Sequence, residues 1–113
     1  MSSSNRLNPS AASELERLRP ALEQICRRLG VARLWLFGSA LSPNWSSSSS
    51  DFDFLVEYGP PPKGVDLFEQ FFVMKVELET LFNRPVDLVD RSAIRKPEFR
   101  RAAEASALEL YAA

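Results

Sequence analysis

The sequence predicts a layered α/β domain, and two observations carry this prediction. Segments with helical periodicity alternate along the chain with short apolar segments of the kind that form strands. The length of 113 residues fits one domain and is enough to bury a hydrophobic core without a disulfide or a zinc ion. We therefore expect a disordered N-terminal tail over residues 1–9 and a single domain over residues 10–113.

The first half of the chain contains one predicted helix and two predicted strands. Residues 10–29 place their leucines on one face of a helix, and Pro20 should cause a kink in it. Residues 31–37 are almost continuously apolar, which is typical of a strand buried on both faces. A polar loop that ends in five serines follows, and residues 51–58 then form the second predicted strand.

The second half begins with a break at Gly59 and three prolines and continues with a long helix. Asp66 can cap this helix, and Glu69 stands at the reciprocal position of a capping box. Asn83 can end the helix in a left-handed turn. The remaining predicted elements are a third strand over residues 85–89, a basic helix over residues 97–105 and an edge strand over residues 108–111.

The long helix at residues 66–82 carries more apolar residues than one face against a sheet requires. A core helix is the simplest interpretation of most of this stripe. We expect part of it, including Phe72, Met74 or Val76, to be exposed in the monomer and covered by a partner.

Composition excludes several classes of function. The chain has no histidine, so serine–histidine or cysteine–histidine catalysis and histidine-ligated zinc are excluded. A net charge of −1 argues against a general nucleic-acid-binding protein. Cys26 is the single cysteine and cannot form an internal disulfide, and no apolar run approaches the roughly 18 residues of a membrane span. We expect a cytoplasmic protein with no membrane contact.

Asp51 and Asp53 are the first candidate site residues. They lie two positions apart in a predicted strand, so both side chains should point from the same face. Two carboxylates held side by side repel each other unless a cation lies between them. Mg²⁺ is the natural candidate, because it binds one or two protein carboxylates together with phosphate oxygens. The alternative is that both aspartates simply face water at the edge of a strand.

Gly38, Ser39 and Asp87 are the other candidates. Gly38-Ser39 follows a buried strand, where a glycine lets the backbone approach a ligand and Ser39 adds a hydroxyl donor. Asp87 interrupts an otherwise apolar short strand, and an acid there is costly if it is buried and unpaired. Considered alone, Gly38-Ser39 could be a plain turn. Asp87 could be an acid that faces outward from a half-exposed strand.

Taken together, these features resemble the DNA polymerase β-like nucleotidyltransferases, and above all their smallest branch, the minimal nucleotidyltransferases. The resemblance covers residues 31–89. The residues that carry it are Leu36-Phe37-Gly38-Ser39, Ser50-Asp51-Phe52-Asp53-Phe54-Leu55-Val56, Asp66-Leu67-Phe68 and Arg84-Pro85-Val86-Asp87-Leu88-Val89. It implies the polymerase β-like fold, which is a small mixed β-sheet with helices packed on it.

The resemblance also implies an activity and a site. Asp51, Asp53 and Asp87 would be the catalytic residues and would ligate Mg²⁺, while Gly38 and Ser39 would hold the triphosphate of ATP. The implied reaction transfers a nucleoside monophosphate, AMP in the case of ATP, to a hydroxyl group. Small members of the family pair with HEPN-domain toxins, which implies a tyrosine of such a toxin as the acceptor.

Two alternatives remain at this stage. The family usually carries a basic residue and a glycine after the Gly-Ser turn, whereas this chain has Ala40-Leu41-Ser42-Pro43. The chain could therefore be an antitoxin that acts by binding alone, with an idle site. It could also transfer a nucleotide to a small molecule. The sequence leaves the nucleotide, the acceptor and a possible homo-oligomer open.

Overall fold

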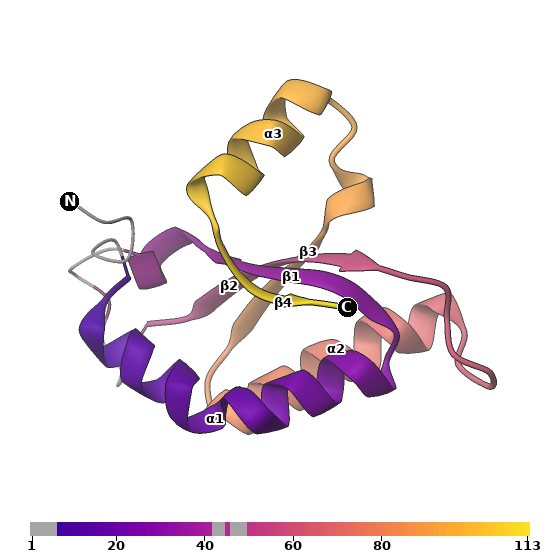
Figure 1. Cartoon of the computed structure of the whole chain (residues 1–113), viewed down its shortest axis with the longest axis horizontal. Coiled ribbons are helices and arrows are strands. Elements are labelled where there is room, and N and C mark those ends of the chain that lie inside the picture. Colours follow the sequence, from indigo (N-terminus) through magenta and orange to yellow (C-terminus); the bar gives the residue numbers. More distant parts are fainter. Residues whose placement is uncertain (1–6, 42–44, 46–49) are drawn as a thin grey trace.

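A four-stranded mixed sheet organises the molecule (Figure 1). The computed structural model describes residues 7–41, 45 and 50–113. The strand order is β3 (Val86–Asp90), β2 (Phe52–Tyr58), β1 (Val31–Phe37) and β4 (Leu108–Ala112). Strand β1 is antiparallel to both β2 and β4, whereas β2 and β3 are parallel. This arrangement confirms the predicted α/β class. The elements are α1 (Pro9–Arg28), β1 (Val31–Phe37), the 3₁₀ helix η2 (Gly38–Leu41), β2 (Phe52–Tyr58), α2 (Leu67–Phe82), β3 (Val86–Asp90), the 3₁₀ helix η3 (Arg91–Ala93), α3 (Pro97–Ser106) and β4 (Leu108–Ala112).

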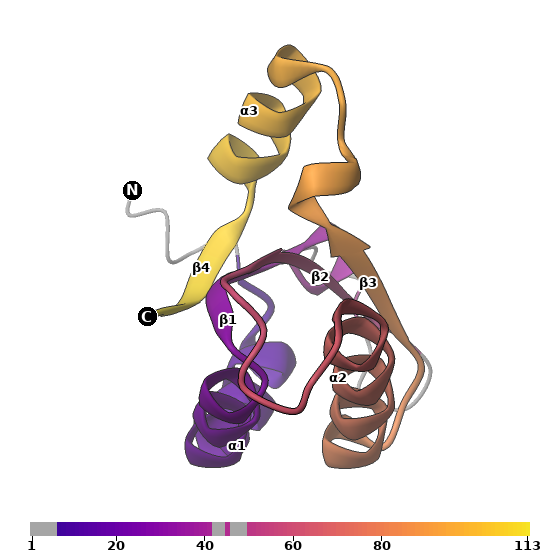
Figure 2. The same cartoon turned by 90° about the vertical axis from the view of Figure 1, so that its right-hand side faces the viewer.

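Of the α-helices in the described part of the chain, α1 and α2 cover one face of the sheet (Figure 2). Figure 2 shows α1 and α2 side by side on this face and α3 on the opposite side of the sheet. In β2 the residues that join the core cluster with α1 and α2 are Phe52, Phe54 and Val56. Because side chains alternate along a strand, Asp53 and Leu55 belong to the face on which α3 lies.

The first helix begins earlier than predicted. Asn8 caps α1, since its Oδ1 accepts hydrogen bonds from the amides of Ser10 at 2.9 Å and Ala11 at 3.3 Å. Asn8 is only 6% exposed, and its backbone amide donates a hydrogen bond to the Ala40 carbonyl at 3.0 Å. The fold therefore includes Asn8, which the sequence assigned to the tail, whereas residues 1–6 lie outside the described residues. The helix continues across Pro20, and its course bends along its length (Figure 1).

The signals predicted for α2 are confirmed. The Asp66 side chain accepts from the Glu69 amide at 2.8 Å, Glu69 reaches back to the Asp66 amide, and Asn83 ends the helix with φ at 52°. The helix buries Met74, Leu78 and Phe82 and leaves Phe72 and Val76 at least half exposed. The expected exposure is therefore confirmed for Phe72 and Val76 and wrong for Met74, because Met74 lies on the face that packs against the sheet. In the described part of the chain, none of the helices combines the length and the apolar character that crossing a membrane requires.

Candidate active site at the Gly38 end of the sheet

Asp53 and Asp87 lie side by side in the sheet. They are direct partners in the register of the parallel strands β2 and β3. Asp53 is half-buried and Asp87 is exposed. Both belong to the face opposite α1 and α2. Glu57 shares that face, and its carboxylate lies 3.9 Å from Arg91, which in turn pairs with Glu104 of α3. The register thus brings together two acids that are 34 positions apart in the sequence.

Gly38 packs directly onto Asp53. It ends β1 immediately after Phe37, the register partner of Asp53, and its φ of +78° lies in the left-handed region. A β-carbon at this position would lie 2.3 Å from Asp53 Oδ2 and 3.0 Å from its Cγ. Only a glycine satisfies both the backbone geometry and this close approach. Ser39 follows in η2, and its side chain lies outside what the structure describes.

Asp51 lies just outside the ladder that holds the other two aspartates. It is exposed and lies one residue before β2, so the predicted start of this strand at residue 51 is one residue too early. The ladder between β2 and β3 starts at Phe52 and Val86, and the residue before Val86 is Pro85, which has no amide hydrogen to extend it. Among the described residues, no three side chains of His, Cys, Asp or Glu are grouped as a ready metal site.

The backbone on both sides of Asp51 is held by two residues that sequence reasoning did not single out. Trp45 Nε1 donates to the Asp51 carbonyl at 2.9 Å, and Arg84 Nη1 donates to the Ser50 carbonyl at 3.0 Å. Arg84 also pairs with Glu14 of α1 through Nη2, at 2.8 and 2.9 Å. Arg84 belongs to the Arg84-Pro85 motif, but the motif gives no sign of its contacts. Nothing in the sequence links Trp45 to Asp51.

Of two groups that could react by themselves, the Cys26 thiol lies in the core and the Tyr58 hydroxyl belongs to a partly buried residue packed against it. Burial raises the pKa of the Cys26 thiol to about 12, so the thiol stays protonated at neutral pH and is not a nucleophile. Burial also raises the pKa of the Tyr58 hydroxyl, with a further contribution from the nearby Asp90 carboxylate. Cys26 is thus a small buried residue of the core.

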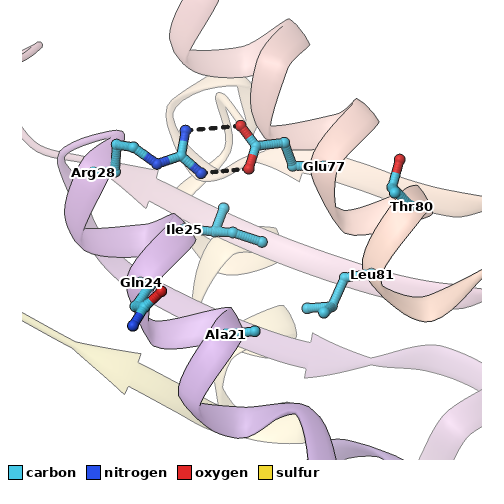
Figure 3. Close-up of a pocket in the computed structure, with 7 residues that line it drawn as sticks. All are labelled: Ala21, Gln24, Ile25, Arg28, Glu77, Thr80 and Leu81. Carbon is cyan, nitrogen blue, oxygen red and sulfur yellow. Dashed lines mark hydrogen bonds and ion pairs between the residues drawn. The ribbon is translucent and has the colours of Figure 1, made fainter.

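A groove between α1 and α2 lies away from the carboxylates of Asp53 and Asp87. Figure 3 shows Ile25 and Leu81 within it and an ion pair between Arg28 and Glu77 across it. Arg28 Nη1 donates to Glu77 Oε2 at 2.8 Å, and Nη2 donates to Oε1. This hydrogen bonding lowers the pKa of the Glu77 carboxyl. Because the helices cover the other face of the sheet, the groove is separate from the site around Asp53.

Comparisons with known proteins find a matching domain family and similar solved structures. The model of the nucleotidyltransferase domain family matches residues 18–110. A structure described as a minimal nucleotidyltransferase is 29% identical with a TM-score of 0.65, over 83% of this chain and 90% of that one. A toxin–antitoxin structure with AMP-PNP is 17% identical with a TM-score of 0.60, over 84% of this chain and 73% of that one. A toxin–antitoxin MntA-HepT structure is 16% identical with a TM-score of 0.56, over 87% and 73%. The last two likenesses show a common fold. No curated protein matches the chain.

Proposed function

Because the chain belongs to the nucleotidyltransferase domain family, we propose that it transfers AMP from ATP to a hydroxyl group. The observation that carries this proposal is the pairing of Asp53 and Asp87 in the sheet, with Gly38 packed on Asp53. In this reaction the acceptor oxygen bonds to the α-phosphorus of ATP, the bond to the bridging oxygen breaks, and pyrophosphate leaves. The acceptor proton passes to a carboxylate or to water.

The donor set fits Mg²⁺. Two adjacent carboxylates, with Asp51 one residue before β2, supply the hard oxygen ligands that Mg²⁺ prefers, and phosphate oxygens of the substrate complete such a shell. Asp51, Asp53 and Asp87 would hold the ion. When bound, it would neutralise phosphate charge and orient the attacking and leaving oxygens. Since the described residues form no ready cluster of three, metal and triphosphate should bind together.

The residues of the chain have separate tasks in this scheme. Gly38 has no side chain, so the Asp53 carboxylate can pack against the backbone, where the turn would hold the triphosphate. Ser39 would add a hydroxyl donor to the triphosphate. Asp87, the more exposed of the pair, would accept the proton of the acceptor hydroxyl. Without histidine, positioning and neutralisation of charge must supply most of the rate.

The acceptor that we propose is a tyrosine of a HEPN-type partner toxin. Two similar structures are described as toxin–antitoxin structures, one of them MntA-HepT. A protein acceptor also suits the exposed apolar surface of α2, which comprises Leu67, Phe68, Phe72 and Val76. Exposed apolar surface of this kind commonly marks a contact with another protein.

Transfer of label tests the activity. The purified chain is incubated with Mg²⁺ and host lysate, in parallel with ATP labelled at the α-phosphate or at the γ-phosphate. The α-label should enter one protein and the γ-label should not, because AMP is retained and pyrophosphate leaves. Asp53→Asn should abolish labelling. Asp90→Asn is the matched control, since it removes the same charge from β3 three residues beyond Asp87.

A second candidate is an antitoxin that neutralises its partner by contact alone. The exposed residues of α2 favour it equally, because they require a partner but no chemistry. The two candidates differ in the behaviour of Asp53→Asn. If this variant still binds and neutralises the toxin without any label, binding alone is the function. Label on a small molecule instead of a protein would support the third possibility raised by the sequence.

A further inference from the structure

A buried aromatic and charged cluster lies directly behind Asp51. Trp45 and Phe52 stack with ring centroids 5.0 Å apart, and the Arg84 guanidinium lies 4.7 Å from the Trp45 ring and 5.1 Å from the Phe52 ring. Trp45 is 4% exposed, and the side chains of Arg84 and Glu14 are 9% and 12% exposed. Packing alone does not require a charge here, since buried ion pairs are weak contributors to stability. The polar contacts of this cluster therefore need another explanation.

The hydrogen bonds of the cluster converge on the backbone of Asp51. Arg84 holds the carbonyl of Ser50, which belongs to the peptide group before Asp51, and Trp45 holds the Asp51 carbonyl in the peptide group after it. When both flanking peptide planes are fixed, φ and ψ of the residue between them are fixed too. The direction of the Asp51 Cα–Cβ bond is then set, although its carboxylate is exposed and lies outside the strand.

The same cluster relates Asp51 to the other carboxylates. Arg84 stands three residues before Asp87, and the amide of Phe52 donates to the Pro85 carbonyl at 3.4 Å. Glu14 anchors the guanidinium to α1 by two hydrogen bonds, so the guanidinium cannot shift without breaking them. The start of β2 is thus attached to the segment that leads into β3, where Asp87 lies.

We propose that Trp45 and Arg84 are positioning residues, which orient the Asp51 carboxylate toward the Mg²⁺–triphosphate site through the two peptide groups that flank it. This inference rests on the function proposed above and deepens it. It explains how an exposed aspartate outside the strand can act together with Asp53 and Asp87. Neither residue is expected to touch the nucleotide.

Trp45→Phe is the sharpest test, because it removes the donor to the Asp51 carbonyl and keeps an aromatic ring against Phe52 and Arg84. Trp35→Phe is a closely matched control. Trp35 is 2% exposed and has an arginine, Arg33, 4.5 Å above its ring, but it lies in the middle of β1. Both variants lose one buried indole, and only one of them loses the hydrogen bond to Asp51.

Binding of AMP-PNP is measured by calorimetry over a range of Mg²⁺ concentrations. Trp45→Phe should raise the Mg²⁺ concentration for half-maximal binding by roughly threefold to tenfold, the range expected for one lost hydrogen bond. Affinity at saturating Mg²⁺ should stay close to that of the wild type, and Trp35→Phe should change neither quantity. In hydrogen exchange followed by NMR, the Phe52 amide should exchange faster in Trp45→Phe than in Trp35→Phe.

Arg84→Lys is a second variant, which keeps the charge but cannot hold Ser50 and Glu14 with one planar group. It should raise the Mg²⁺ requirement further, and if it does not fold, the two tryptophan variants decide the question. Equal Mg²⁺ dependence in Trp45→Phe and the wild type would overturn the positioning role while leaving the proposed function intact. A wild-type chain whose AMP-PNP binding ignores Mg²⁺ would overturn both.

Discussion

Replacing Gly38 by alanine should disrupt the site from within, by displacing Asp53. The substitution has two costs. A side chain at φ +78° strains the backbone by about 1–2 kcal/mol. The new β-carbon would also lie 2.3 Å from Asp53 Oδ2. Rotating the carboxylate gives incomplete relief, because the Asp53 Cγ and Cβ would be only 3.0 and 3.2 Å away. Forced repacking of this kind adds about 1–3 kcal/mol.

Gly64→Ala separates the two costs. Gly64 has a φ of +86° and no heavy atom within 4 Å of the position that its β-carbon would take. Gly64→Ala should therefore lower the free energy of unfolding only by the backbone strain of about 1–2 kcal/mol. The two variants should differ in free energy of unfolding by about 1–3 kcal/mol, which corresponds to about 4–12 °C in melting temperature for a domain of this size.

The assay is thermal unfolding of both variants, followed by calorimetric titration with AMP-PNP and Mg²⁺. Gly38→Ala should melt below Gly64→Ala and should bind AMP-PNP at least tenfold more weakly, whereas Gly64→Ala should bind like the wild type. Equal melting temperatures would refute the close contact between Gly38 and Asp53. Unchanged binding in Gly38→Ala, despite a lower melting temperature, would refute the assignment of Asp53 to the site.

Further outcomes are expected for Asp87, for Cys26 and for the exposed and buried faces of α2. Asp87→Asn removes one of two like charges that face each other across β2 and β3, so in metal-free buffer its melting temperature should rise slightly, while Mg²⁺ with AMP-PNP should no longer stabilise it. The Cys26 thiol, with its pKa raised from 9.0 to about 12, should resist thiol reagents until urea unfolds the chain. Because the pKa of the thiol is higher in the folded state than in the unfolded state, the stability that the protonated thiol contributes is complete below pH 9 and declines above it. In urea unfolding, Cys26→Ala should therefore lose less stability than the wild type between pH 9 and 11. Phe72→Ser should leave the melting temperature nearly unchanged and weaken toxin capture, whereas Leu78→Ala should cost about 3 kcal/mol in urea unfolding because Leu78 is fully buried.

Local signals in the sequence were enough for most of the elements. The strand Val31–Phe37 has the predicted bounds, and the capping box of Asp66 and Glu69 starts α2 as expected. These features depend on hydrophobic periodicity and on side chains that bond to neighbouring amides, so they can be recognised within a few residues. The cap of α1 by Asn8 was missed, because its burial depends on the distant carbonyl groups of Ala40 and Trp45.

The kinds of residue in the candidate site could also be predicted, but their arrangement could not. The sequence by itself determined that Gly38 ends a strand and that aspartates stand near the starts of two others. Tertiary structure decided that Asp53 is opposite Asp87, that Asp51 falls outside the ladder, and that Arg84 reaches Ser50 across 34 positions. The physical reason is that strand register and long-range hydrogen bonds depend on how the whole sheet packs on α1 and α2, which no local pattern encodes.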